Sequence, residues 1–243
     1  MSLKLKEGAF VVADAHYSPT LRPELLAFFQ AIEKEQLQPT QLILMGDIFD
    51  ALFGSIEFTF KQNEQILQVL YGIASKIEVV LLEGNHDFNL TNKLQNIKVY
   101  PMGMQPLQCS YGEKTLYLAH GDFDAPFGYK LYSAIIRNAV VLKVLNFIDK
   151  RNSDNIIKKI EEYLTKKDDC KEFVGFESFI EKRNLENFKA DYFIEGHYHQ
   201  NKSMQLKKLH YINLGAFACN QRYFVVKSSQ DKELLEEKSF FKR

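Results

Sequence analysis

The sequence has no excess of charge of either sign and no low-complexity tract. Its 243 residues include 31 lysines and arginines against 31 aspartates and glutamates. This balance argues against a protein whose main task is to grip a polyanion, so we expect no nucleic-acid partner. No Pro-, Gly- or Ser-rich stretch marks a linker, and no internal repeat is present, which favours one large α/β domain or two small ones.

The chain also lacks a signal-peptide pattern and has few cysteines. Residues 1–7 contain no apolar stretch, so we expect a cytoplasmic protein without a signal peptide. The three cysteines, Cys109, Cys170 and Cys219, lie far apart and do not have metal-finger spacing. We therefore expect reduced thiols. Hydrophobic residues make up 46% of the chain, which is enough for a sizeable core.

The first third of the chain alternates short apolar strands with amphipathic helices. Strands are expected at 9–13, 41–45 and 77–82, with helices at 23–36 and 61–76 between them. This β-α-β-α-β order is typical of open α/β sheets, in which ligands bind beyond the carboxyl ends of the strands.

Short strands and one long helical segment follow. The helical segment interrupts the strand pattern, so we expect an α/β core (1–122 and 189–229), a helical cap insertion (123–188) and a charged C-terminal tail (230–243) that frays. Further strands are expected at 98–100, 107–111, 115–119, 191–195, 209–214 and 222–227, and helices at 129–149, 155–166 and 173–187.

Five polar motifs, each directly after an apolar β-like run, carry five of the six histidines. Because strands of one sheet end together, the turns after them converge on one rim. Each motif alone could be an ordinary turn, but their joint occurrence favours a two-metal hydrolase. The motifs are Asp14-Ala15-His16, Gly46-Asp47-Ile48-Phe49-Asp50, Gly84-Asn85-His86-Asp87, His120-Gly121-Asp122 and Gly196-His197-Tyr198-His199.

The motifs supply two carboxylates, one amide and four imidazoles that suit divalent metals. This set is large enough for two ions with open positions for water and a phosphate. The ions are expected to be Mn²⁺, while Fe and Zn²⁺ fit the same ligands. The candidate ligands are Asp14, His16, Asp47, Asn85, His120, His197 and His199.

The order of these motifs resembles the calcineurin-like metallophosphoesterases over nearly the whole chain. The resemblance implies a four-layer α/β/β/α sandwich with two metals at the sheet rim. It further implies the roles of individual residues. Asp14, His16 and His199 would hold one ion, Asn85, His120 and His197 the other, and Asp47 both, while Asp50, Asp87 and Asp122 would orient the imidazoles and the backbone.

His86 follows the candidate ligand Asn85 directly, and we predict both as catalytic residues. His86 is placed to protonate a leaving oxygen or to neutralise charge in the transition state. The structural alternative is a ring that stacks beneath the site.

The expected helix at 134–148 is unusually apolar, but it is too short to span a bilayer, and Arg137 and Lys143 interrupt it. Residues 130–167 hold an excess of basic over acidic side chains. These features fit an amphiphilic anionic substrate or peripheral contact with a membrane, and equally a dimer contact or an ordinary buried helix pair.

A helical insertion directly after His120-Gly121-Asp122 resembles the UDP-2,3-diacylglucosamine hydrolases of lipid A synthesis. That resemblance implies cleavage of UDP-2,3-diacylglucosamine, a lipid-linked nucleotide sugar, to 2,3-diacylglucosamine 1-phosphate and UMP. It places the protein in the cytoplasm, peripherally on the inner membrane. Tyr129 and Arg137 would then stand for the aromatic and basic substrate-binding residues of the cap.

One departure from that group keeps an alternative open. His86 stands where the group usually has arginine, and a proton donor suits an alkoxide leaving group better than a phosphate. The alternative is a soluble phosphodiesterase or phosphatase acting on nucleotides or phosphoproteins. A non-catalytic scaffold would be expected to have lost ligands, whereas all seven positions are filled here.

Overall fold

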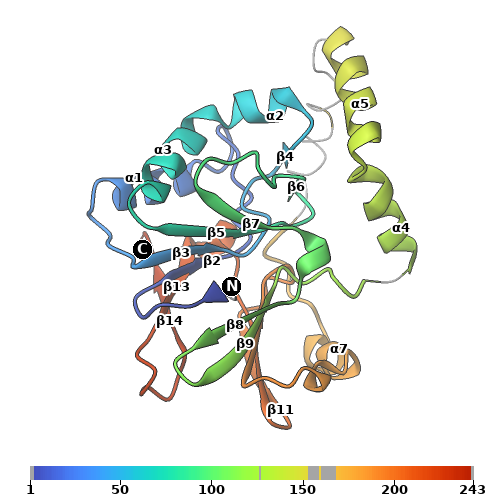
Figure 1. Ribbon diagram of the computed structural model, residues 1–243. Helices are drawn as coiled ribbons and strands as arrows, with labels where there is room; N and C mark the ends of the chain where they lie inside the picture. The colour runs from blue at the N-terminus through green and yellow to red at the C-terminus, as the bar shows by residue number, and fades with distance from the viewer. Residues whose placement is uncertain (1–2, 126, 153–158, 160–167, 242–243) are drawn as a thin grey trace.

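Two six-stranded sheets form the centre of the computed structural model (Figure 1). The structure describes residues 3–125, 127–152, 159 and 168–241, and only the backbone of Phe127, Tyr129, Lys130 and Tyr132. One sheet has the order β1 (Leu3–Lys4), β8 (Leu107–Tyr111), β9 (Lys114–Ala119), β10 (Tyr192–Glu195), β12 (Leu209–Asn213) and β11 (Lys202–Leu206). The other has the order β14 (Leu235–Ser239), β13 (Arg222–Val226), β2 (Phe10–Val12), β3 (Gln41–Leu44), β5 (Glu78–Leu82) and β7 (Ile97–Tyr100).

The β2, β3 and β5 strands are apolar apart from Gln41 and Glu78 at the start of β3 and β5, because both of their faces are buried. Val11, Ile43 and Val80 pack toward the other sheet, in one core with residues of β8 and β9. Their neighbours Val12 and Leu44 belong to a second core beneath helices. Parallel strands covered on both sides show such continuous apolar runs.

Helices cover the outer face of each sheet, which gives four layers. α1 (Glu24–Glu33) and α3 (Glu64–Ala74) pack on the β2–β3–β5 sheet. On the other sheet, α7 (Phe176–Lys182) packs through Phe176 and Ile180 against Phe193 of β10 and Tyr211 of β12. The expected α/β/β/α sandwich is confirmed. Short elements complete the chain: α2 (Glu57–Gln62), β4 (Leu52–Phe53), β6 (Asp87–Phe88), η1 (Met102–Met104), η2 (Leu185–Asn187) and α8 (Phe217–Asn220).

The expected fraying of the C-terminal tail was wrong for residues 235–239. They form β14, which pairs antiparallel with β13 from Arg222 opposite Ser239 to Val226 opposite Leu235. β13 would otherwise be an edge with unpaired backbone groups, which this charged strand satisfies. The preceding Leu234 is buried and attaches the segment to the core between the sheets. Because this edge strand carries charged side chains, the hydropathy pattern did not predict it.

Two expected helices are divided in the structure. The helix at 61–76 is α2 followed by α3, with the break at Asn63. The helix at 129–149 is α4 (Phe127–Ile136) followed by α5 (Ala139–Arg151). Asn138 separates the latter pair, because its side chain accepts hydrogen bonds from the backbone N–H groups of Val140 and Val141 and so starts a new helix. The helix expected at 155–166 lies outside the described residues.

α5 stands at the edge of the molecule (Figure 1). Leu142 packs in a small cluster with Phe53, Ile56 and Phe88, and Lys150 pairs with Glu57 of α2 at 2.6 Å. None of the described helices combines the length and the apolarity that crossing a bilayer requires.

The expectation of three reduced thiols was wrong for two of the cysteines. Cys170 and Cys219, 49 residues apart in the chain, form a disulfide with their Cα atoms 5.6 Å apart. Cys109 is free and buried in β8. Sequence spacing could not reveal the bond, because only the return of the chain from the helical insertion brings Cys170 against α8.

Candidate metal centre

The polar motifs converge because each follows the carboxyl end of a parallel strand. β2, β3 and β5 are neighbours in one sheet, and β9 and β10 are neighbours in the other. Asp14, Asp47 and Asn85 come within three residues of the first three strands, while His120 and His197 follow the last two. The candidate ligands therefore lie where the rims of the two sheets meet.

The structure brings six of the predicted ligands together as two groups of three. Within each group the atoms that could bind a metal all lie within 4.8 Å of one another. In the first group His199 Nε2 is 3.2 Å from Asp14 Oδ1, and in the second His120 Nε2 is 3.4 Å from Asp47 Oδ2. The groups are Asp14, His16 and His199, and Asp47, His120 and His197.

Asn85, the seventh predicted ligand, joins the second group. Its Oδ1 lies 3.2 Å from His120 Nε2, and His197 Nδ1 lies 3.1 Å from the same nitrogen. Three electron-pair donors, counting Asp47 Oδ2, thus face one imidazole nitrogen, which can share at most one proton. A cation among these atoms would satisfy them all, so the residues fit a divalent metal.

His16 gives a second indication that the centre fits a metal. Its ring is 3% exposed, and its Nε2 has no hydrogen-bond partner among the described residues. An unpaired buried nitrogen is costly unless another group binds it. Its Nδ1 is 3.5 Å from Asp50 Oδ1, an arrangement in which a carboxylate orients an imidazole.

The backbone of the centre is held in an uncommon conformation. Left-handed φ values are rare outside glycine, and they concentrate at functional sites that the surrounding structure fixes. Hydrogen bonds between the strand-end loops fix them here, including His16 N to Asp47 O at 3.0 Å. Five candidate ligands have positive φ: Asp14 (51°), His16 (45°), Asp47 (50°), His197 (63°) and His199 (59°).

Two glycines of the motifs leave room for the carboxylates. A Cβ atom at Gly84 would overlap Asp47 Oδ1, and one at Gly196 would overlap Asp14 Oδ2. Both glycines therefore allow a backbone segment to approach a candidate ligand more closely than any side chain would permit.

Asp87 joins two of the ligand-bearing loops. Its buried carboxylate accepts hydrogen bonds from the N–H groups of Asp47 (3.0 Å), Ile48 (2.7 Å) and Gly84 (2.9 Å). Burial and the nearby Asp47 carboxylate raise the pKa of Asp87 to about 7. The side chain lies behind the centre, where it holds backbone rather than a metal.

His86 lies beside the centre with one nitrogen engaged. Its backbone N–H donates to Asp47 Oδ1 at 2.8 Å, and its Nδ1 is 3.0 Å from the Asp50 carbonyl oxygen. A carbonyl can only accept, so the proton is on Nδ1 and Nε2 remains available, 4.0 Å from Asp47 Oδ2. Burial lowers the pKa of His86. His86 also forms a third potential ligand group with His16 and Asp50.

Charge couples the candidate ligands strongly. Burial alone would raise the pKa of Asp47, but the neighbouring His120 and His86 hold it well below the ordinary value. Burial lowers the pKa of His199, yet Asp14 beside it outweighs this and raises the pKa to about 9. Burial and the charge of His120 lower the pKa of His197 to about 4. The carboxylates thus favour protons on the neighbouring imidazoles, and a bound cation would have to displace those protons.

Of the two predicted substrate-binding residues, the structure describes the side chain of Arg137 but not that of Tyr129. Tyr129 has its backbone in α4, and its side chain lies outside the described part of the chain. The Arg137 guanidinium donates to the Gly84 carbonyl at 3.0 Å and lies 3.4 Å from Asp122 Oδ2. In this arrangement Arg137 and Asp122 attach the end of α4 to the loop that carries Asn85.

Several residues that fix the centre were not found from the sequence. Asn213 donates to the Gly196 carbonyl at 2.6 Å and accepts from Gln200 N at 2.8 Å. Gln105 accepts from His120 N at 2.6 Å. Neither residue has a motif around it, and only the paired strands place them, so no local signal could have indicated them.

A buried ion pair joins the two ends of the predicted insertion. Arg183 pairs with the fully buried Glu195, which directly precedes Gly196, and with Asp124 at 2.8 Å. Asp124 lies near the start of the insertion and Arg183 near its end. The pair therefore fastens both ends beside the loop that carries His197 and His199.

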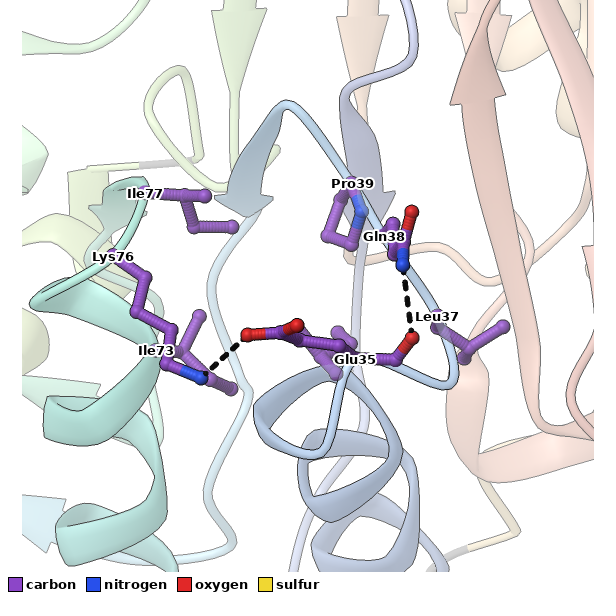
Figure 2. Close-up of a pocket in the computed structure, with 8 residues that line it drawn as sticks. Glu35, Leu37, Gln38, Pro39, Ile73, Lys76 and Ile77 are labelled. Atoms are coloured by element: carbon purple, nitrogen blue, oxygen red, sulfur yellow. Dashed lines mark hydrogen bonds and ion pairs between the residues drawn. The ribbon is translucent and has the colours of Figure 1, made fainter.

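A cavity of about 320 Å³ lies at the opposite end of the strands (Figure 2). Its polar contacts include the ion pair between Lys76 Nζ and Glu35 Oε1 at 3.0 Å and the hydrogen bond from Gln38 Nε2 to the Glu35 carbonyl at 3.2 Å (Figure 2). Apolar side chains such as Leu37 and Ile73 also line the cavity. These residues precede β3 and β5, whereas the candidate ligands follow the strands. The cavity carries none of the motif residues.

Comparison with known proteins agrees with the geometry. The sequence profile described as calcineurin-like phosphoesterase matches residues 9–201. The UDP-2,3-diacylglucosamine hydrolase of Psychromonas ingrahamii is 29% identical over 143 residues, which are 56% of this chain and 57% of that protein. The same-named protein of Histophilus somni is 31% identical over 119 residues, 46% of this chain and 48% of that one.

These matches span about half the length of the curated relatives. Among solved structures, the phosphoesterase Yfce of E. coli is similar over 96% of this chain and 99% of that one, with a TM-score of 0.47 and 13% identity.

Proposed function

Because the chain belongs to the calcineurin-like phosphoesterase family, we propose that it hydrolyses phosphoesters or pyrophosphates with two divalent metal ions. The observation that supports this most directly is the pair of three-residue groups, each within 4.8 Å, at the rim of the sandwich. In the proposed arrangement Asp14, His16 and His199 bind one ion, Asn85, His120 and His197 bind the other, and Asp47 serves both.

The proposed chemistry is attack of water on phosphorus. The two ions would supply Lewis acidity that activates the water and neutralises the phosphoryl oxygens. Asp50 orients His16 through its carboxylate and His86 through its carbonyl. His86 then presents Nε2 toward the centre, where it can take up the proton that the attacking water loses and deliver it to the leaving oxygen. Asp87 and Arg137 keep the loops of Asp47 and Asn85 in place.

For the metal we propose Mn²⁺. A mixture of carboxylate, amide and imidazole ligands suits it, and Fe and Zn²⁺ suit the same set. Equilibrium binding of each ion to the metal-free protein, followed by turnover measurements with each, would rank them.

For the substrate we propose UDP-2,3-diacylglucosamine, cleaved to 2,3-diacylglucosamine 1-phosphate and UMP. The relatives carry this name, and α4 and α5 expose an apolar surface that could hold acyl chains. Six of their large apolar side chains are between 47% and 69% exposed. They are Leu131, Ile135, Val140, Val144, Phe147 and Ile148, which we call the apolar face.

Basic side chains flank the apolar face. Lys143, Lys150 and Arg151 lie on α5 with it. An apolar surface with basic neighbours suits an anionic amphiphile and the surface of an anionic membrane. We place the protein in the cytoplasm, peripherally on the inner membrane, with residues 123–188 as a cap over the core formed by 1–122 and 189–229.

A substrate panel with Mn²⁺ tests the proposal. Release of UMP from UDP-2,3-diacylglucosamine, at a rate well above that with aryl phosphates and cyclic nucleotides, is the expected result. His86, with its proton-donating capacity, favours a second candidate, a soluble phosphodiesterase or phosphatase. Preference for the small esters would support that candidate and overturn the lipid substrate. Failure of every substrate, with two ions bound, would favour a non-catalytic scaffold.

A further inference from the structure

The segment after the helical insertion lies against the metal centre. We call residues 168–173 the return arm. The Asp169 carbonyl oxygen accepts a hydrogen bond from Nδ1 of His199, one of the candidate ligands. The carboxylate of the same residue pairs with Arg22 Nη2 at 2.6 Å and is only 12% exposed. Asp169 is thus held both by its backbone carbonyl and by its side-chain carboxylate, beside a candidate ligand.

Neighbouring residues of the return arm bind Gln200, which directly follows His199. Gln200 Nε2 donates to the Lys171 carbonyl at 3.1 Å, and Phe173 N donates to Gln200 Oε1 at 2.8 Å. The return arm therefore contacts both the ring of His199 and the residue after it.

The Cys170–Cys219 disulfide attaches the return arm to the opposite side of the same centre. Cys219 lies in α8, whose first residues bind the motif of Asp14. Phe217 N donates to the Ala13 carbonyl at 2.9 Å, and Ala218 N donates to the Asp14 carbonyl at 3.2 Å. The covalent bond thus connects the segment that holds His199 with the loop of Asp14, and both residues belong to the first ligand group.

We propose that the return arm positions His199 for its metal ion and that the Cys170–Cys219 disulfide makes this positioning sensitive to reduction. This regulatory role rests on the proposed two-metal function. Because Nδ1–H is donated to the Asp169 carbonyl, Nε2 is the nitrogen of His199 that is directed toward the ion, and it lies 3.2 Å from Asp14 Oδ1. A hydrogen bond of this kind fixes both the tautomer and the ring orientation of a ligand.

A dithiol can reduce the bond, because Cys170 is exposed and therefore accessible. A thiolate of the dithiol attacks a sulfur of the disulfide and forms a mixed disulfide. Its second thiol then displaces the remaining protein sulfur. The protein gains two electrons and two protons as two thiols, while the dithiol becomes a cyclic disulfide. The return arm then keeps only its non-covalent contacts, which include those with Arg22, His199 and Gln200.

The expected effect is confined to one ion. Loss of a group that orients a metal-binding histidine weakens affinity about 10- to 100-fold. Within the described part of the chain, the hydrogen bonds and ion pairs of the return arm reach His199 and not Asp47, His120 or His197. Reduction should therefore weaken the binding of the first ion and spare the second.

The test is calorimetric titration of Zn²⁺ into the full chain, oxidised or reduced with dithiothreitol that is then removed under anaerobic conditions. The oxidised protein should bind two ions. Reduction should weaken one of them about 10- to 100-fold and leave the other within about twofold. Hydrogen exchange of the metal-free protein gives a second readout, in which the amide of Phe173 should exchange faster after reduction.

Matched variants separate the disulfide from other effects of the reductant. The C170S/C219S double variant should match the reduced protein and should not respond to dithiothreitol. Cys109→Ser removes the free thiol and should respond like the parent. If the double variant does not fold, as judged by circular dichroism, the comparison of oxidised and reduced parent still decides.

Two results would overturn the inference. One is unchanged affinity at both sites after mass spectrometry has confirmed reduction. In that case the two-metal proposal stands and only the role of the return arm fails. The other is an oxidised protein that binds no divalent ion, which would overturn the two-metal function together with this inference.

Discussion

Asp87 accepts hydrogen bonds from the backbone N–H groups of both Asp47 and Gly84, so one buried carboxylate joins the loop after β3 to the loop after β5. The two loops carry Asp47 and Asn85. The distance between these candidate ligands thus depends on a residue that is not itself among the predicted ligands.

Asp87→Ala should loosen both loops. It leaves the N–H groups of Asp47 and Ile48 buried without their acceptor, which costs about 1–3 kcal/mol for each group that finds no other partner, while the Gly84 N–H keeps the Asp87 carbonyl. We expect a lower free energy of unfolding, measured with urea on metal-free protein, and weaker metal binding. Asp87→Asn keeps one acceptor oxygen and should be milder. Equal stability of Asp87→Ala and the parent would show that the loops do not depend on this carboxylate.

Asp47→Ala should remove metal from both positions and abolish turnover. Asp47 lies in the second group, and its pKa also responds to His16 of the first. Elemental analysis after dialysis measures the loss. Asp231→Ala, at an exposed ion pair with Lys227, is the matched control. Two ions retained with full activity would contradict the shared-ligand role.

His86→Ala should barely change the metal content, because His86 uses Nδ1 on a backbone carbonyl. If Nε2 delivers a proton, turnover of an alkyl phosphate should fall roughly 100- to 10,000-fold. An activated aryl ester should lose less, since its oxygen leaves without a proton. Equal losses would indicate orientation or charge stabilisation instead. His86→Arg should favour a pyrophosphate over an alkyl ester, as a fixed cation suits a phosphate leaving group.

Substitution of the apolar face separates the lipid substrate from soluble ones. Val144→Asp and Phe147→Asp alter side chains that are 52% and 55% exposed, so the fold should tolerate them. An apolar side chain buried by an acyl chain would contribute about 1.5–3 kcal/mol to binding, so turnover of a diacylated substrate should fall roughly tenfold to a hundredfold. Turnover of an aryl phosphate should stay unchanged.

Two further positions serve as controls for that experiment. Leu21→Asp changes an apolar side chain that is 60% exposed and lies outside α4 and α5. It should affect neither substrate. Leu142→Asp, at a buried position against Phe53 and Phe88, should lower the melting temperature. Similar losses for both substrates with Phe147→Asp would exclude the apolar face as an acyl-chain site.

Metal affinity should increase with pH up to about 9. The pKa of His199 is raised to about 9, chiefly because Asp14 outweighs burial. Below that pH a proton occupies the ring and competes with the ion, so each pH unit should change affinity about tenfold per proton displaced. Calorimetric titrations of Zn²⁺ from pH 6.5 to 9.5 would measure this. A constant affinity between pH 7 and 9 would contradict a protonated His199.

The same raised pKa has a consequence for the metal-free fold. A histidine whose pKa is higher in the folded than in the unfolded chain stabilises the fold fully below the unfolded value of 6.5. That contribution should disappear as the pH rises toward about 9. Urea unfolding of metal-free protein across this range should show the loss, and His199→Gln should reduce it.

Much of the site follows from the sequence because its motifs are local. A polar motif after an apolar strand places Asp14 or His120 at a sheet rim without knowledge of the rest of the chain. The breaks in the helices were missed because Asn63 and Asn138 act through local hydrogen bonds that do not alter the hydrophobic period. β14 was missed because its residues are charged, and pairing with β13 rather than burial makes it a strand.

The supporting residues of the centre could not be found in the same way. Asn213, Gln105 and Asp169 are isolated in the sequence, and only the tertiary structure brings them to His120 and to the loop of His197 and His199. The disulfide could not be predicted for the same reason, since 49 residues separate its cysteines. Contacts between distant segments have no periodic signature.

The origin of the ligands in two different sheets gives the metal ions a mechanical role. Asp14 and Asp47 follow strands of one sheet, while His120 and His199 follow strands of the other. Bound ions would connect the two sheets of the sandwich at one end, beside the apolar core to which Val11 and Leu118 both belong. Removal of the ions by a chelator should therefore let the two sheets separate from this end first. On metal loading, the backbone amides of both sheets should become better protected against hydrogen exchange together. The gain should depend on the metal concentration relative to the dissociation constant.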